Sequence, residues 1–347
     1  MRISKLFTLT LVIFGVVLFF GCEGPEGPAG PAGEAGAAGA DAQVTCLDCH
    51  NDATLADNQF EMARSQHGLG SVGVGYAGGR GSCGPCHSHE QFVEFATTGD
   101  NAGNYLTPTP WKCSTCHGLH GTFDEEFSAD TDYALRLTDP VTAMFDDLTS
   151  MDIDASSNLC IQCHQSRRGI DGYWNGTDAQ AVITSSHTGP HHGPQANLLL
   201  GNNGSVAGTP FSFHVDAGCV GCHMKETTGE DELDVAGGHT FWPAVEACVT
   251  CHPSATDFDI GGVQEDIETK LHDLGLLLLG EGILAWEYDD SGDSSLHLHT
   301  GTYDAAVFQA FWNWVYVEED RSFGVHNPTY AEDLLDAAIA SVDGVPN

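Results

Sequence analysis

The chain has 347 residues, which is enough for one or two domains with an apolar core. Its 49 Asp and Glu residues against 11 Lys and Arg residues give a formal net charge of −38 at pH 7. This balance excludes nucleic acid and anionic membrane surfaces as partners, because both are bound by clusters of Lys and Arg. A cationic partner or a mineral surface is compatible with the charge.

The N-terminal segment predicts export. A short basic start is followed by an apolar run up to Gly21, which is shorter than a membrane span of ~20 residues and is typical of a signal peptide. The junction between Gly21 and Cys22 resembles a bacterial lipoprotein signal, so residues 1–21 are predicted to be removed and Cys22 to be lipidated. Phe19 and Phe20 depart from the usual small or aliphatic residues there, which leaves an ordinary signal peptide or an uncleaved anchor as alternatives. Lipidation would place the protein at the outer membrane, facing the periplasm or the cell surface.

Residues 22–44 predict a tether. Six glycines recur at every third position, as in collagen: Gly24, Gly27, Gly30, Gly33, Gly36 and Gly39. Six triplets are few for a triple helix, so we expect an extended lipid-anchored spacer with polyproline II character rather than a trimer. Cys22 also accounts for the odd count of 13 cysteines and leaves 12 for other roles.

The remaining cysteines form six copies of a C-x-x-C-H motif, which we number 1 to 6 in chain order. The copies are Cys46-Cys49-His50, Cys83-Cys86-His87, Cys113-Cys116-His117, Cys160-Cys163-His164, Cys219-Cys222-His223 and Cys248-Cys251-His252. Two cysteines three residues apart present their thiols to the two vinyl groups of one porphyrin edge, and the next residue brings an imidazole to the iron. The pattern predicts six haem c groups, with each cysteine pair forming thioethers and each motif histidine as the proximal iron ligand.

Zinc knuckles and disulfides are the alternative explanations of paired cysteines. Neither constrains the residue after the second cysteine, whereas all six copies have histidine there. Histidine makes up only 18 of the 347 residues, so a chance match at six positions is remote. Six covalent haems also explain why residues 45–260 lack a periodic apolar pattern, since the macrocycles would supply the apolar surface of this hexahaem cytochrome domain.

Residues 261–347 predict a helical C-terminal subdomain. Helical apolar spacing covers residues 263–280, 303–320 and 327–340, and a polar acidic loop is expected over 287–301. Asn327 is a candidate N-cap and Pro328 suits the first helical position of the last helix. The second helix is unusually aromatic, and we expect it to pack the subdomain.

Several phrases around the motifs resemble the bacterial multihaem cytochromes c, including "CSTCHGLH", "NLCIQCHQSRR" and "SSHTGPHHGPQANLLLG". The resemblance covers most of residues 45–342 and extends distantly to nitrite reductase and octahaem oxidoreductases. It implies a mainly α-helical fold with extensive loops, organised around stacked haems. In this family the ligand on the second face of each iron decides the function.

The supply of side chains favours histidine at that second face. Only four methionines follow the signal, whereas 12 histidines remain beyond the proximal ones, so bis-His ligation at low potential is expected. Ligation needs neutral imidazoles. The candidate distal ligands are His67, His120, His187 or His192, His214, His239 and His326, with His191 competing in the same stretch and His89 as a further candidate.

Three other expectations concern single residues. His120 follows the proximal His117 by three positions, so it is predicted to serve a neighbouring haem rather than its own. Arg167 and Arg168 are candidates to pair with haem propionates. The remaining histidines of the acidic tail are expected at the surface: His272, His297 and His299.

The predicted function is an exported cytochrome that relays electrons between redox protein partners, which include other cytochromes and extracellular acceptors. A reductase of small nitrogen or sulfur species at one open haem is the enzymatic alternative. A subunit of an extracellular cytochrome filament is the structural alternative. No C-x-x-C-K motif marks an open catalytic haem.

Overall fold

The computed structural model describes residues 52–70, 72–101, 103–118, 135–227, 236–288 and 294–343. These residues lie in one compact unit. The predicted signal peptide and tether lie outside them, and so do Cys22, Cys46, Cys49, His50 and His120. Within the described ranges, no helix has the length and apolar character needed to cross a membrane.

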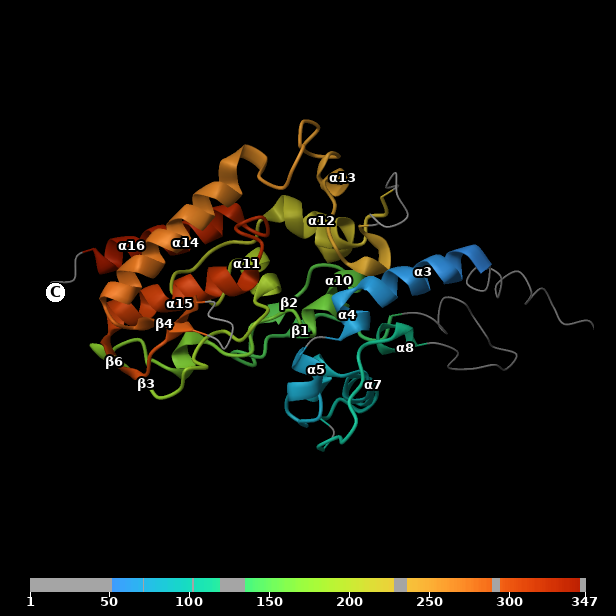
Figure 1. Cartoon of the computed structure of the whole chain (residues 1–347), viewed down its shortest axis with the longest axis horizontal. Helices are drawn as coiled ribbons and strands as arrows, with labels where there is room; N and C mark the ends of the chain where they lie inside the picture. Colours follow the sequence, from blue (N-terminus) through green and yellow to red (C-terminus); the bar gives the residue numbers. More distant parts are fainter. Residues whose placement is uncertain are drawn as a thin grey trace, which may run out of the picture. The chain divides into compact units, whose positions relative to one another are not determined.

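Helices and loops predominate, as the sequence predicts, and the strands are short (Figure 1). The elements before residue 263 are α3 (Asp52–Arg64), α4 (Gln66–Leu69), α5 (Val72–Ala77), α6 (Gly84–His87), α7 (His89–Thr98), α8 (Cys113–Cys116), β1 (Val141–Thr142), β2 (Ser150–Met151), α10 (Ala155–Ile161), η1 (Ile170–Gly172), β3 (Gln180–Ile183), α11 (Gln195–Leu200), α12 (Ser212–His223), η2 (Gly238–Thr240), α13 (Val245–Cys248) and η3 (Ile260–Gly262). Those after it are α14 (Val263–Gly280), β4 (Leu284–Tyr288), β5 (Ser294–Leu298), β6 (Gly301–Asp304), α15 (Ala305–Asp320) and α16 (Pro328–Val342).

The three expected C-terminal helices are confirmed as α14, α15 and α16. Asn327 caps α16 by accepting a hydrogen bond from the backbone N–H of Tyr330 at 3.1 Å, with Pro328 in the first turn. The aromatic face of α15 packs as expected, since Trp312 and Tyr316 are fully buried. This core also includes Ala181 and Ile183 of β3.

The expected loop over residues 287–301 is wrong. β4 and β5 form an antiparallel hairpin in which Leu284 pairs with Leu298 and Trp286 with Leu296. These alternating apolar residues form one face of the hairpin, a period-2 signal that the surrounding acidic residues obscured in the sequence. β6 then pairs with β3, more than 100 residues earlier in the chain.

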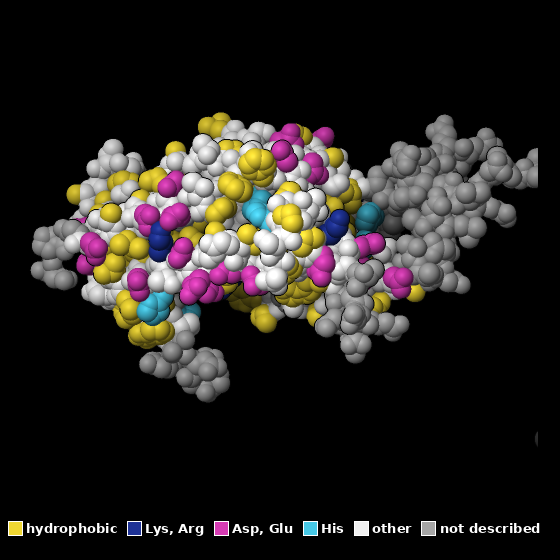
Figure 2. All heavy atoms as spheres, turned by 90° about the horizontal axis from the view of Figure 1, so that it is seen from above, with side chains coloured by type: hydrophobic (Ala, Val, Ile, Leu, Met, Phe, Trp, Pro, Cys, Tyr) yellow, Lys and Arg dark blue, Asp and Glu magenta, His cyan; other side chains and the backbone are white. Residues whose placement is uncertain are grey.

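The motif-bearing part has a much smaller side-chain core. Its buried apolar cluster consists of Val141, Ala143, Met151, Ile161 and Ala196. Polar hydrogen bonds and tight backbone turns connect the remaining short helices. On the face seen in Figure 2, Asp and Glu side chains are spread widely, whereas Lys and Arg are few.

One glycine shows how closely these short helices approach each other. Gly218 breaks α12 with φ 66° and ψ 177°, and a Cβ built on it would lie 2.3 Å from Asp154 Oδ2. The kink lets the backbone N–H of Cys219 donate to Ser157 Oγ at 2.9 Å. Motif 5 is thereby held against α10, the helix in which motif 4 begins.

Candidate haem-binding site

The described C-x-x-C-H motifs form single helical turns. In motifs 3, 4 and 6 the backbone N–H of the histidine donates to the carbonyl of the first cysteine, at 3.0, 2.9 and 2.8 Å. The last four residues of motif 2 form α6, which Cys83 precedes, and motif 5 is the end of α12. Residues three apart in a helical turn lie on one side, so this conformation presents both thiols of a motif together. None of the ten described cysteines forms a disulfide.

Thiols of different motifs meet one another. A hydrogen bond to Cys163 lowers the pKa of the Cys86 thiol, which joins motif 2 to motif 4. The two turns interlock, because Cys86 Sγ lies 3.7 Å from the carbonyl oxygen of Gln162 and Cys163 Sγ lies 3.9 Å from that of Pro85. Motif 2 therefore adjoins motif 4 and not only its sequence neighbours.

Two further contacts extend this arrangement. A hydrogen bond joins the thiols of Cys160 in motif 4 and Cys219 in motif 5, raising the pKa of Cys160. In motif 5, burial raises the pKa of Cys222, and the nearby Cys248 of motif 6 adds to the shift. Motifs 2, 4, 5 and 6 thus follow one another in space.

Four motif histidines each face a histidine from elsewhere in the chain. The ring centroids are separated by 6.1 Å for His67 and His164, 6.2 Å for His87 and His191, 6.3 Å for His117 and His239, and 6.3 Å for His223 and His326. The partners are far apart in sequence, so the fold brings these pairs together. The separation is nearly the same in all four.

This separation fits a metal ion between the rings. A histidine nitrogen binds a first-row metal at ~2.0 Å, which puts the ring centroid ~3.1 Å from the metal. Two rings on opposite sides of one metal then have centroids ~6.3 Å apart, as observed. The interplanar angles range from 34° to 87°, which is compatible with two rings turned differently about a shared axis.

Second contacts orient several of these rings. The Nδ1 atom of His164 lies 3.2 Å from Gln195 Oε1, that of His223 2.9 Å from the Phe241 carbonyl, and that of His326 2.7 Å from Asp320 Oδ1. An Nδ1–H that donates to such an acceptor leaves Nε2 with its lone pair free. Each of these rings therefore presents Nε2 as the ligand atom.

The electrostatics favour neutral imidazoles at two of the facing rings, His67 and His191. Burial, and after it the nearby His164, lowers the pKa of His67 to about 4. Burial, with His192 and Arg167 adding smaller effects, lowers the pKa of His191 to about 4. Both rings are thus neutral at physiological pH, as metal ligation requires.

His214 lies near the motif 6 histidine without making one of the four ring pairs. Burial is the main cause that lowers the pKa of His214, and the charge of His252 contributes to the shift. The Nδ1 of His214 donates to the carbonyl of Val325 at 2.7 Å. Val325 directly precedes His326 in the chain. One short segment therefore carries one candidate ligand and contacts another.

Residues 187–192 contain three candidate ligands. The ring that faces His87 is that of His191, rather than that of His187 or His192. His191 has a left-handed backbone conformation (φ 73°), and its ring centroid lies 5.3 Å from that of its neighbour His192. The Nδ1 of His192 instead contacts Glu319 Oε2 at 2.6 Å. His187 is exposed.

The remaining candidates have other contacts. Arg167 Nη1 lies 3.8 Å from Cys83 Sγ, while Arg168 Nη1 donates to the Tyr173 hydroxyl at 2.6 Å. The His89 Nδ1 lies 2.7 Å from the hydroxyl of Thr115, inside motif 3. The surface positions expected of the tail histidines are confirmed for His272, His297 and His299.

Apolar surface lies beside the motifs. Phe213 next to His214, Trp242 near His239 and Val249 within motif 6 are 77%, 52% and 41% exposed. A porphyrin attached at these motifs would find apolar contacts of this kind, so the residues present fit haem c in ligand type, ring separation and surroundings.

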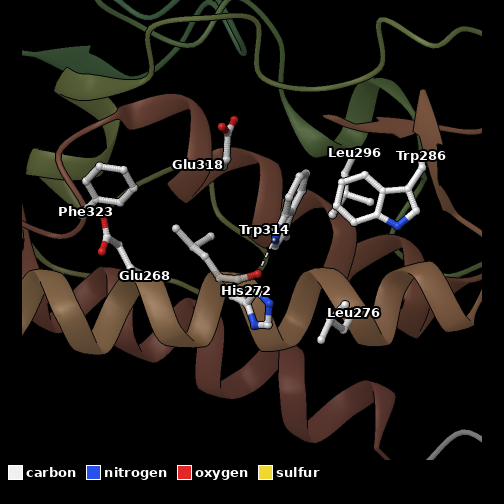
Figure 3. Close-up of a pocket in the computed structure, with 9 residues that line it drawn as sticks. Glu268, His272, Leu276, Trp286, Leu296, Trp314, Glu318 and Phe323 are labelled. Atoms are coloured by element: carbon white, nitrogen blue, oxygen red, sulfur yellow. Dashed lines mark hydrogen bonds between the residues drawn. The ribbon is translucent and has the colours of Figure 1, made fainter. Parts of the chain in front are cut away.

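A pocket of about 220 Å³ lies elsewhere, between α14, α15 and the β4–β5 hairpin (Figure 3). Trp286 and Leu296 line one end and Phe323 the other, with Trp314 between them. Trp314 Nε1 donates to the Leu271 carbonyl at 2.9 Å. None of the lining residues belongs to a motif or to the candidate ligands.

Comparisons with known proteins also find cytochromes, as the C-x-x-C-H motifs predict. No protein-family model matches the chain. The chain is similar to the C-type polyheme cytochrome OmcB of Geobacter sulfurreducens, in two strains, with 23% identity over 318 residues that cover 76% of this chain and 40% of OmcB. The match thus spans less than half of the relative's length.

Two solved structures are also similar. The outer cell wall cytochrome OcwA has 20% identity and a TM-score of 0.48, covering 81% of this chain and 49% of that one. An undecaheme cytochrome from the S-layer of Carboxydothermus ferrireducens has 18% identity and a TM-score of 0.43, covering 81% and 41%. We base the functional conclusion on the motifs and the histidine geometry.

Proposed function

We propose that this multihaem c-type cytochrome relays electrons between external redox partners through six haem c groups. The observation that carries the proposal is the set of four facing histidine pairs at 6.1–6.3 Å, each built on a motif histidine. Two histidine ligands saturate both axial positions of an iron, which favours electron transfer over substrate binding.

The ligand assignments follow from these pairs. His67, His191, His239 and His326 are proposed as distal ligands to the haems of motifs 4, 2, 3 and 5. We assign His214, which lies near His252 and outside the four facing pairs, to the haem of motif 6. By elimination, His120 is then proposed as the distal ligand to the haem of motif 1, whose proximal ligand is His50.

Haem c supplies one-electron chemistry when bound, and the chain supplies its arrangement. Since the cysteines of motifs 2, 4, 5 and 6 adjoin in that order, haems attached to them would be neighbours in the same order. We propose this series as the main electron path, with motif 3 beside motif 4. Arg167, adjacent to Cys83, is a candidate to balance propionate charge within it.

The N-terminal pattern supports an exported, lipid-anchored protein whose tether lets the cytochrome unit reach partners away from the membrane. Outer-membrane attachment through Cys22, facing the periplasm or the cell surface, belongs to this proposal. The acidic surface favours partners with cationic docking patches.

The experiment compares outer-sphere electron transfer with turnover. The full-length, haem-loaded protein is reduced completely and mixed in a stopped-flow instrument with a soluble ferric chelate, and separately with nitrite, hydroxylamine or sulfite. The proposal predicts that mixing with the chelate alone reoxidises all haems. It also predicts that nitrite, hydroxylamine and sulfite are not turned over. Sustained reduction of one of them would support the reductase alternative instead, while regular fibres in negative-stain images would support the filament alternative.

A further inference from the structure

The end of α15 contacts the candidate ligands of several haems. Asp320, the last residue of α15, accepts from the Nδ1 of His326 at 2.7 Å through Oδ1. The backbone carbonyl of the same residue accepts from Gln195 Nε2 at 3.1 Å, and Gln195 Oε1 lies 3.2 Å from the Nδ1 of His164. One residue therefore touches the ligand system of motif 5 directly and that of motif 4 through an amide.

The Asp320 side chain is set apart by its burial and charge. It is 0% exposed, and its second oxygen accepts from the backbone N–H of Ser322 at 3.2 Å and from the Ser322 hydroxyl. A buried carboxylate is stabilised by such donors and acts strongly on a neighbouring group, because water screens it little.

Among the described residues, the acceptors that orient other ligand rings are weaker than the Asp320 carboxylate. Gln195 presents an amide oxygen to His164, and the Phe241 carbonyl serves His223. Glu61, the carboxylate nearest His239, stays 3.8 Å from its Nδ1. The contact of Asp320 with His326, by contrast, is a hydrogen bond from a ligand ring to a buried carboxylate.

We propose that Asp320 is a positioning residue that lowers the reduction potential of the haem held by His223 and His326. This inference rests on the proposed function, since it takes His326 as a distal ligand. A carboxylate that accepts the Nδ1–H increases the electron donation of the imidazole, which stabilises the oxidised iron relative to the reduced iron. The motif 5 haem, between motifs 4 and 6, is thereby a more reducing step of the path than it would be without this carboxylate.

The test uses redox titrations of the full-length, haem-loaded protein, monitored by electron paramagnetic resonance of the low-spin ferric haems. The signal that His326→Ala removes identifies the haem concerned. The variant Asp320→Asn keeps an acceptor oxygen but removes the negative charge. We expect the midpoint potential of this signal to rise by ~59 mV, which corresponds to a tenfold change in the equilibrium constant of a one-electron reduction. Glu318→Gln removes a carboxylate from the same helix turn and should leave this midpoint in place.

A second variant acts in the opposite direction and keeps the carboxylate. Ser322→Ala removes a hydrogen-bond donor from Asp320, concentrates negative charge on the oxygen facing His326, and should lower the same midpoint. It provides the test if Asp320→Asn does not fold.

Three results would overturn the inference. An unmoved midpoint in both variants, or an equal shift in Glu318→Gln, would show that the contact does not set the potential, and would leave the electron-relay proposal intact. If His326→Ala removes no low-spin signal, His326 is not a ligand, and the ligand assignment within the proposed function fails as well.

Discussion

The C-terminal helices and the motif-bearing region are held together in different ways. Helices α14 to α16 share a large apolar core whose centre is formed by fully buried aromatic side chains such as Trp312. The motif-bearing region before residue 263 has one small apolar cluster around Met151 and Ile161. Its order depends on polar contacts, tight turns and, in our account, covalent haems, so loss of cofactor should affect the two regions unequally.

The largest expected effect comes from removing the haem at the centre of the motif-bearing region. Motif 4 contacts motif 2 through Cys163 and motif 5 through Cys160. The double substitution Cys160→Ala and Cys163→Ala should abolish slow hydrogen exchange in α6, α10 and α12, because each of these short helices relies on its neighbours. Slow exchange in α14 to α16 should persist.

The matched control removes the haem of motif 6, whose Cys251 is exposed, by Cys248→Ala and Cys251→Ala. Its effect on exchange should be confined to α12 and α13. Uniform loss of protection across both regions in the motif 4 variant would contradict the distinction between them.

The next effect concerns the side-chain core. Trp312→Ala deletes a fully buried indole and should cost about 3–5 kcal/mol of the free energy of unfolding of the C-terminal helices. Denaturant titration followed by hydrogen exchange would localise the loss. Trp286→Ala, at a side chain 47% exposed, serves as the control and should cost below ~1 kcal/mol. Equal costs would mean that the C-terminal core is not the source of stability there.

A smaller stability effect with a clear spectrum is expected at His67. His67→Ala should leave all haems attached and cost about 1–3 kcal/mol. One haem, that of His164, should turn high-spin in the visible spectrum. His187→Ala, at an exposed histidine, should leave the spectrum unchanged. A low-spin spectrum in the His67 variant would remove His67 from the ligands.

The smallest effect is expected at a surface ion pair of the C-terminal region. Lys270 Nζ contacts Glu332 at 2.9 Å and Asp336 at 2.7 Å, and both carboxylates are more than half exposed. Lys270→Met should cost below ~1 kcal/mol, and less at high salt, because exposed ion pairs are screened. A thermal unfolding series in increasing salt measures this; a cost that salt leaves unchanged would point to lost packing of the side chain.

The sequence predicted features whose signals are local. The C-x-x-C-H motifs are readable because five contiguous positions fix the chemistry, and α16 is readable because Asn327 and Pro328 mark its start. The β4–β5 hairpin was missed because its apolar alternation is short and interrupted by acidic residues.

The pairing of distal histidines could not be read from sequence. His67 and His164 meet across nearly 100 residues, and the ring that faces His87 is that of His191, although His192 is its neighbour in the chain. Asp320 and Gln195 were also missed. Neither lies at a recurring spacing from its histidine, since Asp320 precedes His326 by six residues and Gln195 follows His164 by 31.

The most direct test of the central claim is the electron paramagnetic resonance spectrum of the fully oxidised, full-length haem-loaded protein. The account predicts low-spin ferric signals from every haem, because each iron has two histidine ligands, and no change on addition of nitrite or cyanide. A substoichiometric high-spin signal that shifts with either anion would contradict it, because it would reveal an open haem at which a substrate binds.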